Sequence, residues 1–186
     1  MLPGSKHVAA DLAWLRERRL DAAIAAHITA DKPTLAICGG LQMLGRTIED
    51  PHGVEGSAQG LGLLPCSTEF SKAKRYRHGA YTFDDLSGYW EPLQGIEFTG
   101  YEIHHGATRL DPSAQSGRAP RVVLAYGAGW QSGRLLALYP HGLFESAAVI
   151  RALFGAEAPT LENTLDGLAD FIDTRFAPGV LASLLD

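Results

Sequence analysis

A cysteine follows a short apolar run and precedes two glycines in the segment Ala36-Ile37-Cys38-Gly39-Gly40. A nucleophile elbow bends the chain so sharply that the residues two before and two after the nucleophile must be small, and Ala36 and Gly40 meet this requirement. The elbow also places the sulfur at a helix N-terminus, where unpaired N–H groups and the helix dipole favour the thiolate. The sequence therefore favours Cys38 as a nucleophile over the common alternative, a buried structural cysteine.

A cysteine nucleophile needs a general base, and His141 has the most suitable position among the seven histidines. It follows a predicted strand and precedes a glycine and a new helix, so its ring should emerge at the carboxyl edge of a sheet, where α/β sites are built. His104 and His105 are neighbours on a strand-like piece and point to opposite faces, which makes a poor metal site. We expect a core or supporting role for His104. The remaining four histidines are expected to face water: His7, His27, His52 and His78.

Motifs for several other chemistries are absent from the sequence. It contains no Gly-Lys pair, hence no phosphate-binding loop, and neither GxSxG nor HExxH. We therefore expect that catalysis by this chain needs neither ATP nor a metal ion. The second cysteine, Cys66, has no elbow around it and is interpreted as an inert, partly buried thiol. The two cysteines form no CxxC, so neither a disulfide scaffold nor a zinc ribbon is expected.

The elements that must position these residues alternate between helix and strand. Apolar spacing predicts helices over residues 8–19, with Ser5 as the N-cap, and over 24–30, ending before Pro33. Thr34–Ile37 is too short for a helix and is predicted to be a buried strand that runs into the elbow and a following helix. Strand, tight turn and helix in this order are typical of an α/β fold.

Further strands and two helices are predicted in the rest of the chain. The glycine-rich segment 51–100 should consist of loops and hairpins with short strand-like pieces at 61–64 and 96–98. Residues 121–126 and 134–139 resemble two strands joined by a glycine-containing turn. Helical spacing returns at 145–154 and 161–171.

Length and composition restrict the class of protein. A chain of 186 residues with 46% hydrophobic and 20% charged residues suits one compact domain. The 16 basic and 21 acidic residues give a formal net charge of −5, which argues against a nucleic-acid or anionic-membrane surface. No apolar run approaches the roughly 20 residues of a membrane span, and the first residues lack the regions of a signal peptide, so we expect a cytoplasmic protein.

Several segments, in the same order, resemble the glutamine amidotransferase domain of cobyric acid synthase. The resemblance extends over nearly the whole chain, so residues 1–186 are interpreted as a single domain. It implies an α/β, flavodoxin-like three-layer sandwich with a mixed or mostly parallel sheet, of the class I, triad-type amidotransferases. The segments that carry it are Leu2-Pro3-Gly4-Ser5-Lys6, Asp11 to Arg16, Ile37 to Gly45, Gly100 to Gly106 and His141-Gly142-Leu143-Phe144-Glu145.

The resemblance implies hydrolysis of glutamine to glutamate and ammonia, with Cys38 as nucleophile and His141 as general base and acid. The N–H groups of Gly4 and Gly39 would form the oxyanion hole. Gln42 and the segment 101–104 are candidate substrate contacts, with packing an equally suitable interpretation. The ammonia would serve an ATP-dependent synthetase domain or subunit that amidates corrinoid carboxylates in cobalamin biosynthesis. No cofactor is expected in this chain, and ATP and Mg²⁺ are expected only in that synthetase.

This sequence departs from the family pattern at a few positions. The glutamate that usually follows the histidine by two residues is replaced by Leu143, and the nearest carboxylate is Glu145, so a Cys–His dyad is predicted. The chain begins inside the oxyanion-loop motif, which suggests a domain lacking its first strands. An exposed sheet edge would then lead either to a homodimer that covers it or to a disordered loop before Ser5.

Two other functions stay open at this point. One is a related Cys–His amidotransferase or hydrolase that acts on a cell-wall precursor or a γ-glutamyl compound. The other is an inactive truncated remnant that only folds or oligomerises. The Leu-Pro-Gly-Ser-Lys string favours the corrinoid branch over the first, and an intact, open site around Cys38 would count against the second.

Overall fold

The computed structural model describes residues 1–111, 119–155, 157, 159–177 and 180. Its strands form two four-stranded sheets, one with the order β1-β8-β7-β6 and the other with the order β3-β2-β4-β5. The helices are α1 (Val8–Glu17), α2 (Leu20–Thr29), α3 (Gly39–Leu44), α4 (Ala147–Phe154) and α5 (Leu161–Arg175), with 3-10 turns η1 (Gly88–Leu93), η2 (Ala125–Gly127) and η3 (Leu143–Glu145). The strands are β1 (Thr34–Ile37), β2 (Thr47–Glu49), β3 (Ala58–Gln59), β4 (Cys66–Thr82), β5 (Glu97–Leu110), β6 (Arg121–Leu124), β7 (Gly129–Ser132) and β8 (Leu135–Leu138).

The first sheet positions the predicted nucleophile and base. Its β1 strand pairs in parallel with β8, and β8 pairs antiparallel with β7, so the sheet is mixed. Every residue of β1 and β8 is buried, as expected for strands covered on both faces. Because β1 ends at Ile37 and β8 ends at Leu138, Cys38 and His141 emerge at the same edge. This confirms the predicted α/β class and the predicted strand Thr34–Ile37.

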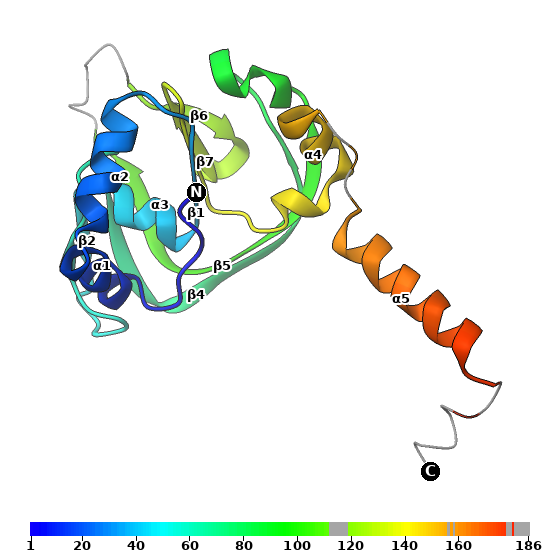
Figure 1. Ribbon diagram of the computed structural model, residues 1–186. Helices are drawn as coiled ribbons and strands as arrows, with labels where there is room; N and C mark the ends of the chain where they lie inside the picture. Colours follow the sequence, from blue (N-terminus) through cyan, green and yellow to red (C-terminus); the bar gives the residue numbers. More distant parts are fainter. Residues whose placement is uncertain (112–118, 156, 158, 178–179, 181–186) are drawn as a thin grey trace.

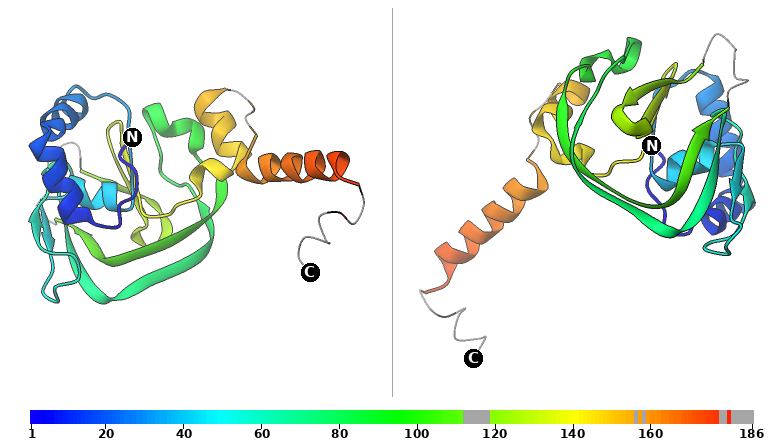
Figure 2. Two further views of the ribbon diagram at one scale, coloured as in Figure 1. Left: turned by 60° about the horizontal axis from the view of Figure 1, so that its bottom comes forward. Right: turned by 180° about the vertical axis from the view of Figure 1, so that it is seen from behind.

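The second sheet contains a hairpin much longer than the short strand-like pieces predicted for residues 51–100. Its β4 and β5 strands span 17 and 14 residues and pair antiparallel from Cys66–Leu110 to Thr82–Glu97. Figures 1 and 2 show this hairpin curving beneath the first sheet, from α1 on one side to α4 on the other. The predicted strand at 61–64 is wrong, since that segment is irregular.

Two features differ from the prediction for identifiable reasons. The predicted Ser5 cap is wrong: α1 begins at Val8, whose N–H donates to the Glu55 carboxylate (3.0 Å) instead. Ser5 Oγ accepts from the His7 N–H and donates to Asp11, which orders the approach to the helix. The predicted turn between 126 and 134 contains a strand of its own, β7, so three strands follow one another where two were expected.

The helices differ in how much of their surface the body of the domain covers. Leu12 of α1 and Val149 of α4 are fully buried. By contrast, α5 extends away from the rest of the domain in all views (Figures 1 and 2) and has no buried residue. Its apolar residues Leu161, Leu165 and Leu168 are each more than half exposed. Among the described residues, no helix is long and apolar enough to cross a membrane.

Candidate active site

Cys38 has the backbone conformation that an elbow requires. Its φ of 50° and ψ of −109° are unfavourable for a residue with a side chain, and this strain is held by hydrogen bonds on both sides. The Cys38 N–H donates to the Leu138 carbonyl (2.7 Å), and its own carbonyl accepts from the Gln42 N–H (3.1 Å). A Cβ at Gly40 would lie 2.5 Å from the Leu2 carbonyl oxygen, so the glycine is needed where the chain segments cross.

The first five residues pack directly against the elbow. Leu2 forms a parallel bridge to β1, donating to the Leu35 carbonyl (2.8 Å) and accepting from the Ile37 N–H (2.9 Å). A Cβ at Gly39 would lie 2.7 Å from the Ser5 nitrogen. These contacts hold the segment before Ser5 in place. The alternative of a disordered loop before Ser5 is therefore wrong.

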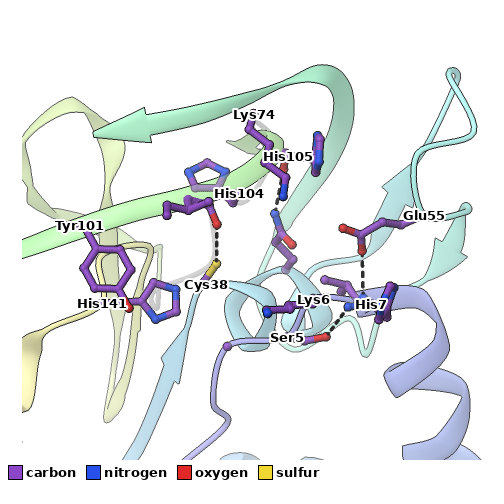
Figure 3. Close-up of a pocket in the computed structure, with 14 residues that line it drawn as sticks. Ser5, Lys6, His7, Cys38, Glu55, Lys74, Tyr101, His104, His105 and His141 are labelled. Atoms are coloured by element: carbon purple, nitrogen blue, oxygen red, sulfur yellow. Dashed lines mark hydrogen bonds between the residues drawn. The ribbon is translucent and has the colours of Figure 1, made fainter. Parts of the chain in front are cut away.

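Cys38 and His141 line one open pocket of about 640 Å³ (Figure 3). The sulfur lies 4.0 Å from the Ile103 carbonyl oxygen of β5, which closes one side of the pocket. The wall contains several charged and imidazole side chains that the sequence analysis did not select as site residues. The lining residues are Gly4, Ser5, Lys6, His7, Val8, Cys38, Gln42, Glu55, Lys74, Tyr101, Ile103, His104, His105 and His141.

His141 is positioned by β5 as well as by the end of β8. Its N–H donates to the Tyr101 carbonyl (2.8 Å), and its carbonyl accepts from the Tyr101 N–H (3.2 Å). The two rings stack with centroids 5.1 Å apart and planes inclined by 14°. Burial, with a smaller effect of positive charge on His104, lowers the pKa of His141. The imidazole is therefore neutral near pH 7 and can accept a proton.

The protonation state of the Cys38 thiol differs from the expectation based on the sequence. Burial raises its pKa to about 11, the Gly39 N–H opposes this shift, and the carboxylates of Glu102 and Glu55 add to it. The expected stabilisation of the thiolate by the helix terminus is thus wrong for the free site, because desolvation of a buried charge outweighs one short helix. Cys38 and His141 therefore line the pocket as a thiol and a neutral imidazole.

The predicted oxyanion donors lie beside these two groups. A Cβ at Gly4 would lie 2.7 Å from Cε1 of His141, so the backbone at residue 4 lies against the imidazole. Within the described chain, the Gly4 N–H has no hydrogen-bond partner. The Gly39 N–H donates toward the sulfur of Cys38. Both roles in an oxyanion hole stay predictions.

Glu145 does not reach His141 as a third member of a triad. Its carboxylate accepts from the Leu161 N–H (3.2 Å) at the start of α5. In the described part of the chain, no carboxylate hydrogen-bonds to the His141 ring. The action of Cys38 and His141 as a dyad stays a prediction.

Gln42, a predicted substrate contact, forms hydrogen bonds within the protein. Gln42 is buried and its Nε2 donates to the His105 carbonyl (3.2 Å) and to Oη of Tyr139 (3.3 Å), so the amide ties α3 to β5 and to the end of β8. These bonds favour packing, and the contact of Gln42 with substrate stays a prediction.

Cys66 is fully buried, and burial raises the pKa of its thiol to about 12. It is more enclosed than predicted and lies outside the pocket.

His104 has a buried acidic partner on the same strand. Glu102 accepts from Oη of Tyr81 (2.8 Å) and from Nε2 of His104 (3.3 Å). His104 is buried as expected, whereas Glu102 was not singled out. Residues 102 and 104 share one face of β5, so the spacing could have revealed the pair. Among the described residues, no group of three or more histidine, cysteine or carboxylate side chains could hold a metal ion.

Residues 1–149 match the model of the CobB/CobQ-like glutamine amidotransferase domain. The chain belongs to this family. The match includes the Cys38 elbow, the Glu102–His104 strand and His141, so the amidotransferase domain contains every element of the pocket described above.

Similar proteins agree with this assignment. The chain is 54% identical to the cobyric acid synthase of Variovorax paradoxus (strain S110) and 52% identical to that of Methylibium petroleiphilum (strain ATCC BAA-1232 / LMG 22953 / PM1). Both alignments cover 100% of this chain but only 39% and 38% of the relative, so the chain spans about two fifths of their length.

Solved structures show the same fold at low sequence identity. A glutamine amidotransferase crystal structure covers 82% of this chain and 75% of its own, with a TM-score of 0.54 and 16% identity. A glutamine amidotransferase from Thermotoga maritima covers 92% of this chain and 63% of its own, with a TM-score of 0.51 and 14% identity. These neighbours support the flavodoxin-like α/β class.

Proposed function

We propose that this amidotransferase domain hydrolyses the side-chain amide of glutamine, with Cys38 as nucleophile and His141 as general base and acid. One observation carries the proposal: a cysteine on a strained elbow and a histidine with a lowered pKa line the same open pocket. A free thiol next to a neutral imidazole is the arrangement that nucleophilic attack on an amide requires.

Cys38 and His141 can together transfer every proton that the hydrolysis requires. As Sγ of Cys38 attacks the amide carbon, its proton moves to His141 and a tetrahedral oxyanion forms. The N–H groups of Gly4 and Gly39 hold that oxygen. The His141 imidazolium then protonates the nitrogen as the C–N bond breaks, releasing ammonia and leaving a thioester. Water, deprotonated by His141, attacks the thioester; glutamate leaves and Cys38 regains its proton.

The raised pKa of Cys38 determines how the first step proceeds. A thiol with a pKa of about 11 is almost entirely protonated near pH 7. The proton must therefore leave during attack, and His141 must be neutral to receive it. The lowered pKa of His141 supplies that condition.

We further propose that the ammonia serves the cobyric acid synthase reaction. The aligned relatives carry that name, and about three fifths of their length lies outside the aligned segment. That remainder would supply the ATP-dependent synthetase that activates corrinoid carboxylates, with ATP and Mg²⁺ bound there and no cofactor in this chain. The expected homodimer stays a prediction.

A glutamate dehydrogenase assay, which measures the glutamate formed from glutamine, tests the proposed hydrolysis. The wild-type chain should form glutamate and ammonia in equal amounts, and Cys38→Ala should form neither. Cys66→Ala is the matched control, because it removes the other buried thiol without touching the pocket. Equal activity in the Cys38→Ala and wild-type proteins would overturn the assignment.

A further inference from the structure

The pocket of Cys38 and His141 also has a charged wall, formed by Lys6, Glu55 and Lys74. Figure 3 shows Cys38 and His141 at one end of the pocket and Glu55 at the other, with the two lysines between them in this view. Glu55 is near enough to the sulfur for its charge to contribute to the raised pKa of the thiol. The reaction proposed above gives the charged wall no role.

Hydrogen bonds on two sides hold Glu55 in place. Its Oε2 accepts from the Val8 N–H (3.0 Å) at the start of α1. Its loop, the connection between β2 and β3, folds around Asp50, whose Oδ2 accepts from the N–H groups of Glu55 (2.7 Å) and Gly56 (2.6 Å). The other carboxylate oxygen of Glu55, Oε1, has no hydrogen-bond partner among the described residues. The carboxylate is therefore fixed with one oxygen available to a ligand.

The two lysines of the charged wall have no counter-ion within the described chain. Lys6 comes from the segment before α1, and Lys74 comes from β4. Neither lysine forms an ion pair with a described residue. Glu55 is the only carboxylate among the described residues that line the pocket. The wall thus presents two cations and one anion that the protein does not pair with one another.

A free α-amino acid carries the complementary charges. Its ammonium and its carboxylate are attached to one carbon, and in glutamine a short aliphatic chain separates that carbon from the side-chain amide. When the amide lies against Cys38, the rest of the molecule extends along the pocket toward the charged wall. A glutamine within a peptide has neither charge at its α-carbon, so the wall favours the free amino acid.

We propose, resting on the function proposed above, that Glu55 accepts hydrogen bonds from the α-ammonium of glutamine while Lys6 and Lys74 pair with its α-carboxylate. These side chains determine specificity, because they select a free α-amino acid and place its amide next to Sγ of Cys38. Glu55 is half-buried, whereas both lysines are exposed. Water screens the exposed charges more strongly, so Glu55 contributes more to binding than either lysine.

Calorimetric binding to the Cys38→Ala protein tests the proposal without requiring hydrolysis. Glutamine is compared with 4-carbamoylbutanoate, which lacks the α-ammonium, and with 4-aminobutanamide, which lacks the α-carboxylate. At low ionic strength the Cys38→Ala protein should bind glutamine more tightly than it binds either analogue.

Glu55→Gln removes the charge but keeps an oxygen that accepts from the Val8 N–H, so the start of α1 should stay intact. In the Cys38→Ala background, Glu55→Gln should raise the Kd of glutamine about tenfold, the scale of one hydrogen bond to a charged group. It should not weaken the binding of 4-carbamoylbutanoate, because that ligand has no ammonium. Glu49→Gln is the matched control, since Glu49 is exposed at the end of β2 and does not line the pocket.

The double variant Lys6→Met/Lys74→Met tests the other half of the charged wall. In the same background it should raise the Kd of glutamine about threefold, as expected for exposed ion pairs. It should not weaken the binding of 4-aminobutanamide, because that ligand has no carboxylate. Lys72→Met is the matched control, since Lys72 is exposed on the same strand as Lys74 and does not line the pocket.

Three results would overturn the role of the charged wall. They are equal binding of glutamine and both analogues to the Cys38→Ala protein, unchanged glutamine binding in a folded Glu55→Gln variant, and an equal loss of glutamine and 4-carbamoylbutanoate binding in that variant. If the expected pattern of binding is found but the wild-type chain forms no glutamate, the proposed hydrolysis fails and the role of the charged wall stands.

Discussion

The backbone of Gly4 lies so close to the ring of His141 that a Cβ at residue 4 would be 2.7 Å from Cε1. Gly4 has no positive φ, so its backbone tolerates a side chain and the conflict is with the imidazole alone. Gly4→Ala should therefore displace His141 while leaving the fold intact. We expect kcat for glutamine hydrolysis to fall by about a hundredfold, the usual scale for a displacement of about 1 Å in a catalytic group.

Gly79→Ala is a matched control for this substitution. Gly79 lies in β4, and a Cβ there would have no atom within 4 Å. Its activity and its free energy of unfolding should stay close to those of the wild type. A Gly4→Ala protein that retains full activity would show that His141 does not need its present position.

A diazoketone analogue of glutamine should label Cys38 and leave Cys66 unmodified. Cys38 lines the open pocket, whereas Cys66 is fully buried outside it. Peptide mass spectrometry identifies the modified residue, and excess glutamine should slow the labelling. An adduct on Cys66, or labelling that glutamine does not slow, would contradict the assigned pocket.

The strained conformation of Cys38 has a measurable effect on stability. A residue in such a region costs about 1–3 kcal/mol, and glycine avoids that cost although it loses about 0.4–1 kcal/mol of stability through the unfolded chain. The free energy of unfolding of Cys38→Gly should thus exceed that of Cys38→Ala by roughly 1 kcal/mol. Cys38→Gly should accordingly unfold at a higher urea concentration. Both variants should be inactive. Equal or lower stability of Cys38→Gly would mean that the elbow is not strained.

Glu145→Gln should hydrolyse glutamine at close to the wild-type rate, because Glu145 is exposed. Its carboxylate bonds to the start of α5, away from His141. The same glutamate dehydrogenase assay measures the effect, with His141→Asn as the inactive comparison. A large loss of kcat in Glu145→Gln would restore the carboxylate as a third catalytic residue.

Local sequence predicted the elements that carry Cys38 and His141 but not the length of the hairpin strands beneath them. The run Thr34–Ile37 and the small residues around Cys38 are short-range signals, and the structure reproduces them. The β4 strand is exposed through Ser71–Tyr76, so it lacks the apolar alternation of a strand. In β5 the buried positions alternate, but Glu102 and His104 occupy two of them, which hides the hydrophobic period. Pairing between distant segments stabilises both strands.

The electrostatic state of the site was harder to predict than its residues. A helix terminus beside Cys38 suggests a thiolate, yet the depth at which the elbow lies below the surface outweighs that local effect on the pKa of the thiol. Burial depends on the N-terminal segment and β5, which are distant from Cys38 in sequence. The partners of Glu102 have the same origin, since Tyr81 comes from the opposite strand of the hairpin.

The pH dependence of kcat/KM should show an acid limb below pH 6.5, the ordinary pKa of a histidine. Burial and His104 lower the pKa of His141, so the neutral base persists to more acidic pH than in an exposed histidine. Below about pH 6.5 the unfolded state binds more protons than the folded state, because the pKa of His141 is lowered only in the folded state. The contribution of His141 therefore makes the free energy of unfolding smaller as the pH falls from about 6.5 toward the lowered pKa. Profiles from about pH 4.5 to 8 on a stable protein would locate the limb. His104→Gln removes one cause of the shift and should move the limb toward higher pH. A wild-type limb at or above about pH 6.5 would contradict the role of a desolvated His141 as the base.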